Sequence, residues 1–408
     1  MVPHAGVLAV GGDWHDRVVR AINDEQRRAR LATRHGIGHR GLSVEGAVDA
    51  MTCLHSTEPP TVFLSVAARS DATREDIGRA LYDDRSVVKQ LAMRRTLFVF
   101  PRELLPAVWG SAAARIAGPL RTRFTKEIEA AAIADDGEAW VSSAFDGVLR
   151  CLAEDGPSTT AELRARLPEL DRRVEVNPGK PYGGVFPLAP RVLVLLGATG
   201  RIVRGANAGD WRVSRPRWTL TEDWLGEPPS RLDSDAGYLE LVRRWLTTFG
   251  PGTEADLVWW LGGTKGGVRQ ALGDLGAVEV QLSDGIGYLL PDDLDDVPVP
   301  EPWAGLLPVL DPTLMGWKQR GFYLDPEDVP FLFDTNGNGG TTAWWDGRVV
   351  GCWVQDPDGV VRVVLRRDVG SEATRALEEE AERLTRWLDG DVVSSVYASL
   401  QMKSARLP

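Results

Sequence analysis

The sequence predicts an α+β protein in which three tandem winged-helix domains precede a C-terminal β-rich domain. Two observations carry this prediction: an internal repeat, and a change to β-type patterning late in the chain. Gly156–Leu163 recurs as Gly250–Leu257, and Leu196–Ile202 recurs in the same order as Leu272–Val278. Matched segments in a fixed order indicate one supersecondary unit that is used twice.

The first copy reads as three helices followed by a β-hairpin, which is the make-up of a winged helix. Thr159 stands where a helix N-cap belongs, with Glu162 as its capping-box partner. A further helix is expected over 191–198. Alternating residues at Arg201–Arg204 and a returning strand at Trp211–Val213 predict the hairpin. The alternative is that such units serve only as a packing scaffold or bind protein.

The second copy repeats this order, and a degenerate third copy lies N-terminal to both. The first copy is longer than the second because it holds a Pro- and Gly-rich loop over 176–190. The second copy is expected to have helices over 241–246, 255–261 and 268–273, and strands over 278–280 and 288–290. The degenerate copy is expected to have helices over 43–54, 61–68, 73–82 and 85–93, and a buried strand over 96–100.

The last part of the chain consists of short β-type runs separated by Asp-Gly and Asn-Gly turns, which predicts a β-rich domain. Strands are expected over 306–310, 342–345, 349–354 and 360–365, and a final amphipathic helix over 372–388. The predicted domains are 1–139 (first winged helix with an N-terminal extension), 140–236 (second, with a linker), 237–297 (third) and 298–408 (β-rich).

Charge is distributed unevenly, although the net charge is −11. Nine Lys and Arg accompany one acid over 85–126, and six Arg accompany one acid over 191–217. Local basic stripes on an acidic protein are typical of a surface directed at nucleic acid. The alternative is that these arginines are solvated surface residues, which a GC-rich bacterial genome would favour. The candidate DNA contacts are Arg94, Arg95, Arg191, Arg201, Arg204 and Arg212.

The composition predicts a cytoplasmic protein that needs no cofactor. The three cysteines lie far apart, no signal peptide is expected, and no run approaches the ~20 apolar residues of a membrane span. Gly262–Gly267 lacks the spacing of a phosphate-binding loop, and no GxSxG nucleophile elbow occurs. His35 and His39 have the spacing of a metal clasp on a helix, but the glycines at 36 and 38 argue against a helix there. We therefore expect neither a metal nor a nucleotide cofactor.

Catalytic chemistry is best sought at His55–Thr57, because all five histidines lie in the first 55 residues. If this segment is extended, His55 and Thr57 project to the same side, where an imidazole and a hydroxyl can hold one water molecule. The alternative is that Thr57 caps a helix that starts at Pro59, with His55 as a structural histidine. The local sequence alone favours this capping alternative.

The chain resembles the AlkZ/YcaQ winged-helix DNA glycosylases over most of its length. The stretches that carry the resemblance are Leu54–Arg69, Met93–Pro101, the hairpin within Gly200–Trp218, and Leu307–Pro312. The resemblance implies a curved DNA-binding body of tandem winged helices and a C-terminal β-barrel. It also implies a Gln-x-Gln or Gln-x-Asp pair that holds the water attacking C1′ of an alkylated purine nucleotide. His55 and Thr57 stand at the position of that pair.

The resemblance thus implies a monofunctional DNA glycosylase that hydrolyses the N-glycosidic bond of N7- or N3-alkylated purines, or of bulky adducts, in duplex DNA. His55 would act as base or water-holder, Thr57 would orient the water, and the adjacent Glu58 is a carboxylate that could substitute. The alternative is a non-catalytic DNA-binding protein, either a regulator or a lesion sensor. The expected partner is double-stranded DNA in the nucleoid, with the protein acting as a monomer and no membrane involved.

Overall fold

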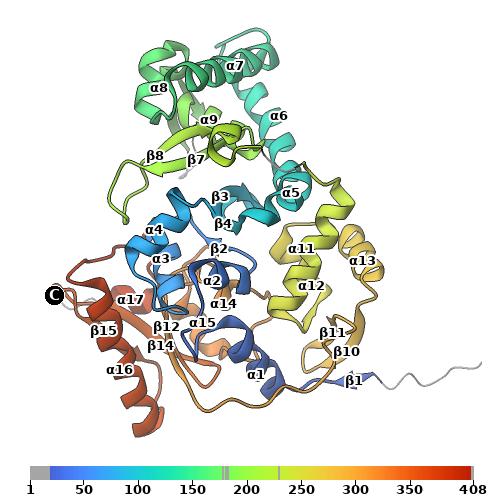
Figure 1. Ribbon diagram of the computed structural model, residues 1–408, viewed down its shortest axis with the longest axis vertical. Helices are drawn as coiled ribbons and strands as arrows, with labels where there is room; N and C mark the ends of the chain where they lie inside the picture. Colours follow the sequence, from blue (N-terminus) through green and yellow to red (C-terminus); the bar gives the residue numbers. More distant parts are fainter. Residues whose placement is uncertain (1–18, 177–178, 180–182, 228–229, 406–408) are drawn as a thin grey trace, which may run out of the picture.

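The computed structural model describes residues 19–176, 179, 183–227 and 230–405, which form a mixed α+β structure (Figure 1). Three stretches of the chain share one order of elements: helix, short strand or bridge, helix, helix, strand, strand. We call them unit 1 (residues 44–101), unit 2 (137–220) and unit 3 (234–289). A C-terminal region (304–405) follows them. Residues 1–18 of the expected N-terminal extension lie outside the described residues.

Unit 1 holds the His55–Thr57 segment. Ser43 and Thr73 cap its first and third helices through their side chains, as their positions before apolar runs predict. The short strand with His55 pairs with the central strand of a three-stranded antiparallel sheet in the order β2–β4–β3. Its elements are α2 (Val44–Ala50), β2 (Leu54–His55), α3 (Pro59–Ala67), α4 (Arg74–Tyr82), β3 (Val87–Ala92) and β4 (Thr96–Pro101), preceded by α1 (Asp24–His35).

Two predictions in unit 1 were wrong. Residues 85–93 were expected to be helical, but Val87–Ala92 form strand β3, because they pair residue by residue with the buried strand β4. The first helix also ends at Ala50 rather than Leu54, which leaves Leu54 and His55 free to pair with β4.

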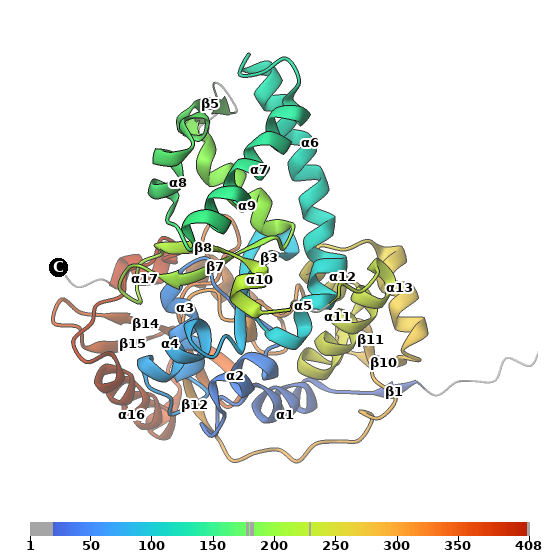
Figure 2. The same cartoon turned by 45° about the horizontal axis from the view of Figure 1, so that its top comes forward.

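A long helical connection separates unit 2 from the rest of the molecule. It consists of α5 (Leu105–Val108), a π-helical turn (109–113) and α6 (Ala114–Ala130), and Figure 2 shows α6 running from the body up to unit 2. Unit 2 comprises α7 (Gly137–Asp155), α8 (Thr160–Arg166), α9 (Leu188–Ala198), β7 (Ile202–Asn207) and β8 (Pro216–Leu220), and α10 (Thr221–Leu225) follows it.

The capping box of unit 2 is confirmed, but its hairpin differs from the prediction. Thr159 and Glu162 exchange both capping hydrogen bonds. The returning strand is Pro216–Leu220 and not Trp211–Val213, because Trp218 bridges to Ser158 across the unit. The predicted 176–190 loop adjoins a two-stranded ribbon, β5 (Arg173–Val176) and β6 (Gly184–Pro187), and residues 177–178 and 180–182 of it lie outside the described residues.

Unit 3 has the helices and strands that the repeat predicts. Its elements are α11 (Ser234–Phe249), β9 (Gly252–Thr253), α12 (Glu254–Leu261), α13 (Lys265–Asp274), β10 (Val278–Leu282) and β11 (Gly285–Leu289). Thr253 and Asp256 form the same capping box as Thr159 and Glu162, which is the structural basis of the sequence repeat. Strand β1 (Arg20–Ala21) adds to this sheet in parallel beside β10.

The C-terminal region is not a closed barrel, which corrects the barrel-like prediction. Its four strands form an open antiparallel sheet in the order β12–β13–β14–β15. Helix α16 packs its apolar stripe on this sheet, through residues such as Leu377 and Leu384, and so covers the face that a barrel would enclose. The region comprises β12 (Ala304–Leu307), α14 (Pro312–Met315), α15 (Val329–Leu332), β13 (Thr342–Trp345), β14 (Arg348–Gln355), β15 (Val361–Leu365), α16 (Gly370–Leu388) and α17 (Leu400–Ala405).

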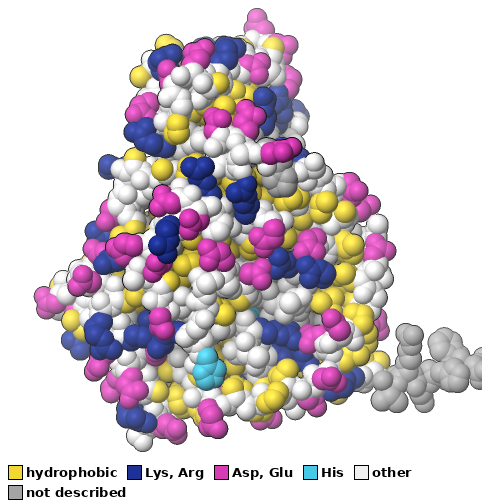
Figure 3. Space-filling view, in the orientation of Figure 1, with side chains coloured by type: hydrophobic (Ala, Val, Ile, Leu, Met, Phe, Trp, Pro, Cys, Tyr) yellow, Lys and Arg dark blue, Asp and Glu magenta, His cyan; other side chains and the backbone are white. Residues whose placement is uncertain are grey.

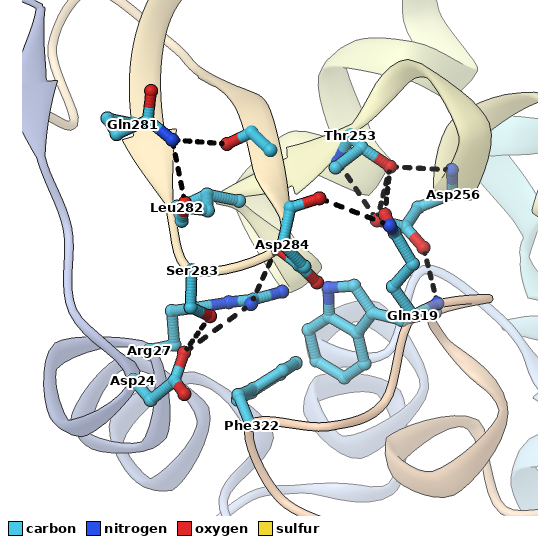
Figure 4. Close-up of polar contacts among 12 residues, drawn as sticks. Asp24, Arg27, Thr253, Asp256, Gln281, Leu282, Ser283, Asp284, Gln319 and Phe322 are labelled. Carbon is cyan, nitrogen blue, oxygen red and sulfur yellow. Dashed lines mark hydrogen bonds and ion pairs between the residues drawn. The ribbon is translucent and has the colours of Figure 1, made fainter.

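Polar contacts hold unit 3 to α1 and to the C-terminal region (Figure 4). The guanidinium of Arg27 lies 3.8 Å from the ring centroid of Phe322 and 3.3 Å from the carboxylate of Asp284. Asp256, which already caps α12, accepts the backbone N–H groups of Lys318 and Gln319 at 2.8 and 2.9 Å. A single buried carboxylate thus fixes both a helix start and a contact between distant segments.

A fully buried ion pair joins unit 1 to the C-terminal region. Both Arg69 and Asp311 have 0% exposed surface, and two hydrogen bonds of 2.7 and 2.8 Å connect them. Ser65 donates a further bond to Asp311, and Arg69 donates to the backbone oxygen of His35. Burial alone would raise the pKa of Asp311, but Arg69 and these hydrogen bonds hold the pKa below its ordinary value.

His35 is a structural histidine rather than a metal ligand. Its ring lies 3.0 Å from the Thr313 hydroxyl and 3.2 Å from the backbone oxygen of Thr248. It ends α1, and Gly36 turns the chain with a φ of 65°, so that the exposed His39 is not on the same helix. No cluster of three or more metal-ligating side chains occurs among the described residues.

No helix within the described residues is long and apolar enough to cross a membrane.

Candidate active site and nucleic-acid interface

His55 is the last residue of strand β2, and the chain bends at Thr57 and Glu58 before α3 begins. His55 pairs with Phe98 on β4, and the two rings pack edge to face at 5.3 Å. The Ser56 amide donates to the backbone oxygen of Leu97 at 2.8 Å. His55 is partly buried, whereas Thr57 is exposed. The sheet therefore fixes His55 and presents Thr57 to solvent.

His55 is uncharged at neutral pH. Burial, together with the positive charge of Arg94, lowers the pKa of His55 to about 3. The backbone N–H of Thr57 donates to Nδ1 of His55 at 3.4 Å. This contact assigns the ring proton to Nε2, since one nitrogen of a neutral imidazole accepts and the other donates. The ring can then hold a ligand oxygen by donating a hydrogen bond to it.

The capping alternative is wrong, because Thr57 does not cap α3. Glu58 occupies the N-cap position, and no side chain makes a capping hydrogen bond there. The carboxylate of Glu58 instead accepts a 2.7 Å hydrogen bond from the backbone N–H of Val396, in the C-terminal region. Burial raises the pKa of Glu58, and hydrogen bonds from Ser395 and Val396 oppose this rise. Thr57 therefore does not serve as the cap of this helix.

Arg94 and Arg95 form the tip of the β3–β4 hairpin in a strained conformation. Their φ angles are 54° and 61°, and the amide of Thr96 donates back to the oxygen of Met93. This is the geometry of a type I′ turn, for which Asn-Gly is the preferred sequence. A non-glycine residue in the left-handed region costs about 1–2 kcal/mol. Such strain is typical of functional sites.

The hairpin tip brings units 1 and 3 together beside His55. The guanidinium of Arg94 lies over the ring of Trp259, from α12, at 4.3 Å from its centroid. Trp259 also contacts the guanidinium of Arg320 at 5.3 Å, which adds a second cation from the C-terminal region. Arg95 is exposed at the tip. Of the predicted DNA contacts, Arg94 and Arg95 are therefore the two that lie closest to the predicted catalytic segment in the fold of unit 1.

The four predicted arginines of unit 2 lie in different environments. Arg191 forms an ion pair with Glu127 and packs over Phe124. Arg204 packs over Trp218, with 5.0 Å between the guanidinium and the ring centroid. Arg201 is exposed and borders a hollow of about 480 Å³ together with Arg150 and Arg231. The structure thus keeps Arg201 open to solvent, whereas Arg191 is already occupied by an acidic partner.

Arg212 lies in a loop that ties unit 2 to the C-terminal region. It forms ion pairs with Asp210 at 2.7 Å and with Asp391 at 2.9 Å. The neighbouring Trp211 donates from its indole to Asp391 at 2.8 Å and packs against Phe63 and Trp387. The basic side chains on the face seen in Figure 3 are likewise interspersed with acidic ones rather than gathered into one patch.

Sequence reasoning missed two features of the site. One is Trp259, which comes from a different unit, so that no local pattern connects it with Arg94. The other is a pocket of about 300 Å³ between the start of α3 and the C-terminal region, lined by Glu58, Thr61 and Trp353 among others. The only signal for this pocket in the sequence is the position of Glu58 directly after the His55–Thr57 segment.

Comparison with known proteins decides the family. The sequence model of the family described as "DNA glycosylase AlkZ-like" matches residues 48–387. The chain belongs to the AlkZ-like DNA glycosylase family. The matched range contains His55–Thr57, Arg94, Arg95 and every element from α3 to β15.

A solved structure supports the same overall fold. The DNA glycosylase AlkZ of Streptomyces sahachiroi superposes with a TM-score of 0.69 and shares 22% identity, covering 91% of this chain and 98% of that one. No sequence among the curated proteins matches. The family supports a DNA-repair glycosylase in general terms, with DNA as the substrate.

Proposed function

We propose that this protein is a monofunctional DNA glycosylase that hydrolyses the N-glycosidic bond of N7- or N3-alkylated purines, or of bulky adducts, in duplex DNA. The observation that carries the proposal is the placement of His55 and Thr57. They stand between the end of β2 and the start of α3 within the family match, one side chain neutral and the other exposed, beside a strained basic hairpin tip. The repeated helix–strand units are, in this proposal, winged helices that grip the duplex.

The reaction needs a positioned water more than it needs a strong acid. Alkylation makes the purine cationic, so the bond between its nitrogen and C1′ breaks with the electron pair going to the base. Nε2–H of His55 donates to the oxygen of the water, and the Thr57 hydroxyl supplies a second polar contact. The water oxygen bonds to C1′ and its proton passes to solvent. Holding a water in the reactive position is an orientation effect on the rate. No cofactor takes part.

The departure from Gln-x-Gln favours one second candidate, a non-catalytic DNA reader that acts as a regulator or lesion sensor. His55 and Thr57 would then be remnants of a lost catalytic pair. This candidate shares DNA binding with the glycosylase but predicts no release of base. A monomer in the nucleoid suits both functions.

We expect the rate of base release to be flat between neutral and mildly acidic pH. The reactive form of His55 is neutral, and a pKa lowered to about 3 keeps it neutral as the pH falls well below the ordinary value of about 6.5. The measurement is the single-turnover release of N7-methylguanine from duplex DNA across this range, with spontaneous depurination subtracted. A loss of rate with a midpoint near 6.5 would mean that His55 titrates freely. Absence of release at every pH would favour the non-catalytic reader.

We also expect Arg95→Ala to reduce the salt dependence of DNA binding. An exposed arginine that neutralises one phosphate contributes about 0.9 to the slope of log Kobs against log salt. The slope is measured by fluorescence anisotropy with a duplex at several salt concentrations. Arg375→Ala, an exposed arginine on α16, is the matched control and should leave the slope unchanged. Equal slopes for the wild type and Arg95→Ala would remove the hairpin tip from the interface.

A further inference from the structure

Four arginines from three parts of the chain converge around the end of helix α12. Arg94 and Arg95 form the tip of the β3–β4 hairpin in unit 1, Arg115 lies at the start of α6, and Arg320 lies between α14 and α15 in the C-terminal region. The hairpin tip contacts both α12 and α6. The fold therefore brings cations that are far apart in the sequence to one place on the molecule.

Two residues at the end of α12 connect these side chains. The ring centroid of Trp259 lies 4.3 Å from the guanidinium of Arg94 and 5.3 Å from that of Arg320. Nε of Arg115 donates a 3.0 Å hydrogen bond to the backbone oxygen of Gly262. A Cβ added to Gly262 would lie 3.3 Å from Cγ of Arg94, so this backbone contacts Arg94 as well. The end of α12 thus holds three guanidinium groups as neighbours, in part through cation–π contacts.

The four arginines have no acidic partners. None of them forms an ion pair with a carboxylate among the described residues, whereas Arg191 and Arg212 do. Partial loss of hydration and the charge of Arg320 lower the pKa of Arg94 to about 10, which still leaves Arg94 a cation at neutral pH. Like charges that are held together without a counter-charge repel one another. An anion that binds among them relieves this repulsion.

A phosphodiester is the anion that fits this group. Arg95 and Arg115 are exposed and Arg320 is partly exposed, so an anion can reach them from solvent. A guanidinium presents paired N–H donors that match two oxygens of a phosphate. Several arginines side by side suit an anion that repeats along a chain. The group also adjoins His55, whose pKa is lowered by burial and by the charge of Arg94.

We propose that Arg94, Arg115 and Arg320 form a clamp that holds consecutive backbone phosphates of the damaged DNA strand, beside the nucleotide whose base is released. The clamp rests on the proposed function, because it takes DNA as the substrate, and it adds Arg115 and Arg320 to the DNA contacts. These are positioning residues. They fix the strand to units 1 and 3 and to the C-terminal region at once, which holds C1′ near the water at His55.

Binding of an undamaged duplex tests the clamp without any reaction. Arg115→Gln and Arg320→Gln each remove one charge, and each should lower the slope of log Kobs against log salt by about 0.9, with the double variant losing about twice as much. Arg320→Lys, which keeps the charge, should keep the wild-type slope. Arg386→Gln, at an exposed position on α16, is the matched control and should bind as the wild type does. Thermal unfolding of each variant checks that the fold is intact.

A second measurement tests whether the clamp lies next to the lesion. The duplex carries N7-methylguanine on a 2′-fluoro nucleotide, whose glycosidic bond resists cleavage, and neutral methylphosphonates replace the phosphates on either side of it. We expect the wild type to lose affinity several-fold on this replacement. The double variant of Arg115 and Arg320 should lose much less, because the partners of these phosphates are already gone.

The outcomes separate the clamp from the proposed function. Unchanged salt slopes in both single variants would overturn the clamp, and so would an equal loss of affinity by the wild type and the double variant on methylphosphonate replacement; either result leaves the glycosylase standing. Thermal stabilisation by inorganic phosphate, with no change of slope in the variants, would indicate a site for a free anion and also overturn the clamp. If both measurements agree with the clamp but the wild type releases no base from DNA, the clamp stands and the glycosylase falls.

Discussion

His55→Ala should lower the rate of base release by about 10²-fold, the loss typical of a reacting group that is no longer held in position. DNA affinity should change little, because the neutral imidazole neutralises no phosphate. The comparison is made with the protein saturating the duplex, so that the observed rate reports the chemical step. His39→Ala, which removes an exposed histidine that the site does not use, is the control.

The double variant His55→Gln with Thr57→Gln sharpens this prediction. It installs the pair to which the family resemblance points, on the same segment between β2 and α3. We expect it to release base at a rate within about tenfold of the wild type, because the segment holds the backbone of both positions and an amide can also hold water. Unchanged release by His55→Ala, or a parallel loss of DNA affinity, would show that His55 is a structural residue.

Arg69→Ala should lower the free energy of unfolding by about 3–5 kcal/mol, because it leaves the buried carboxylate of Asp311 without its counter-charge. The measurement is urea unfolding followed by tryptophan fluorescence. Arg79→Ala breaks an exposed ion pair with Asp76 and should cost no more than about 1 kcal/mol. The double variant Arg69→Met with Asp311→Leu should regain much of the loss, since no charge is then left unpaired. A loss for Arg69→Ala as small as that for Arg79→Ala would contradict this account.

Local signals in the sequence predicted local structure well. The capping boxes at Thr159 and Thr253 are formed as the repeat predicts, because a capping box depends on residues only three positions apart. The helix expected over 73–82 is confirmed as α4 for the same reason, since Thr73 and Asp76 also form a capping box. Two of the stretches that carried the family resemblance meet in the structure, since Arg69 ends one and Asp311 lies in the other.

The wrong predictions concern contacts between distant residues. Val87–Ala92 became a strand through pairing with β4, and the returning strand of unit 2 was set by the bridge between Ser158 and Trp218. Neither partner can be identified from a window of neighbouring residues. The barrel prediction failed in the same way, because the placement of α16 over the open sheet depends on the packing of the whole region.

In the candidate site, too, the sequence predicted what depends on neighbouring residues and missed what depends on contacts between distant ones. His55 was found through its position in the family resemblance, but its lowered pKa comes from burial and from Arg94, which the fold of unit 1 brings near. The basic stripe of unit 2 overstated the available charge, because Arg212 is paired with Asp391, far along the chain. The pocket at Glu58 joins two segments more than 300 residues apart, which no local sequence pattern connects.

The release of free base is the most direct test of the central claim, that His55 and Thr57 make this chain a glycosylase. Purified protein is incubated with duplex DNA that carries N7-methylguanine, and separately with a bulkier N7 adduct. Free base and alkali-labile abasic sites are then counted for the wild type and for His55→Ala. The account predicts release by the wild type and almost none by His55→Ala at equal DNA occupancy. Salt-sensitive DNA binding without release of either base would contradict it and identify a non-catalytic reader of DNA.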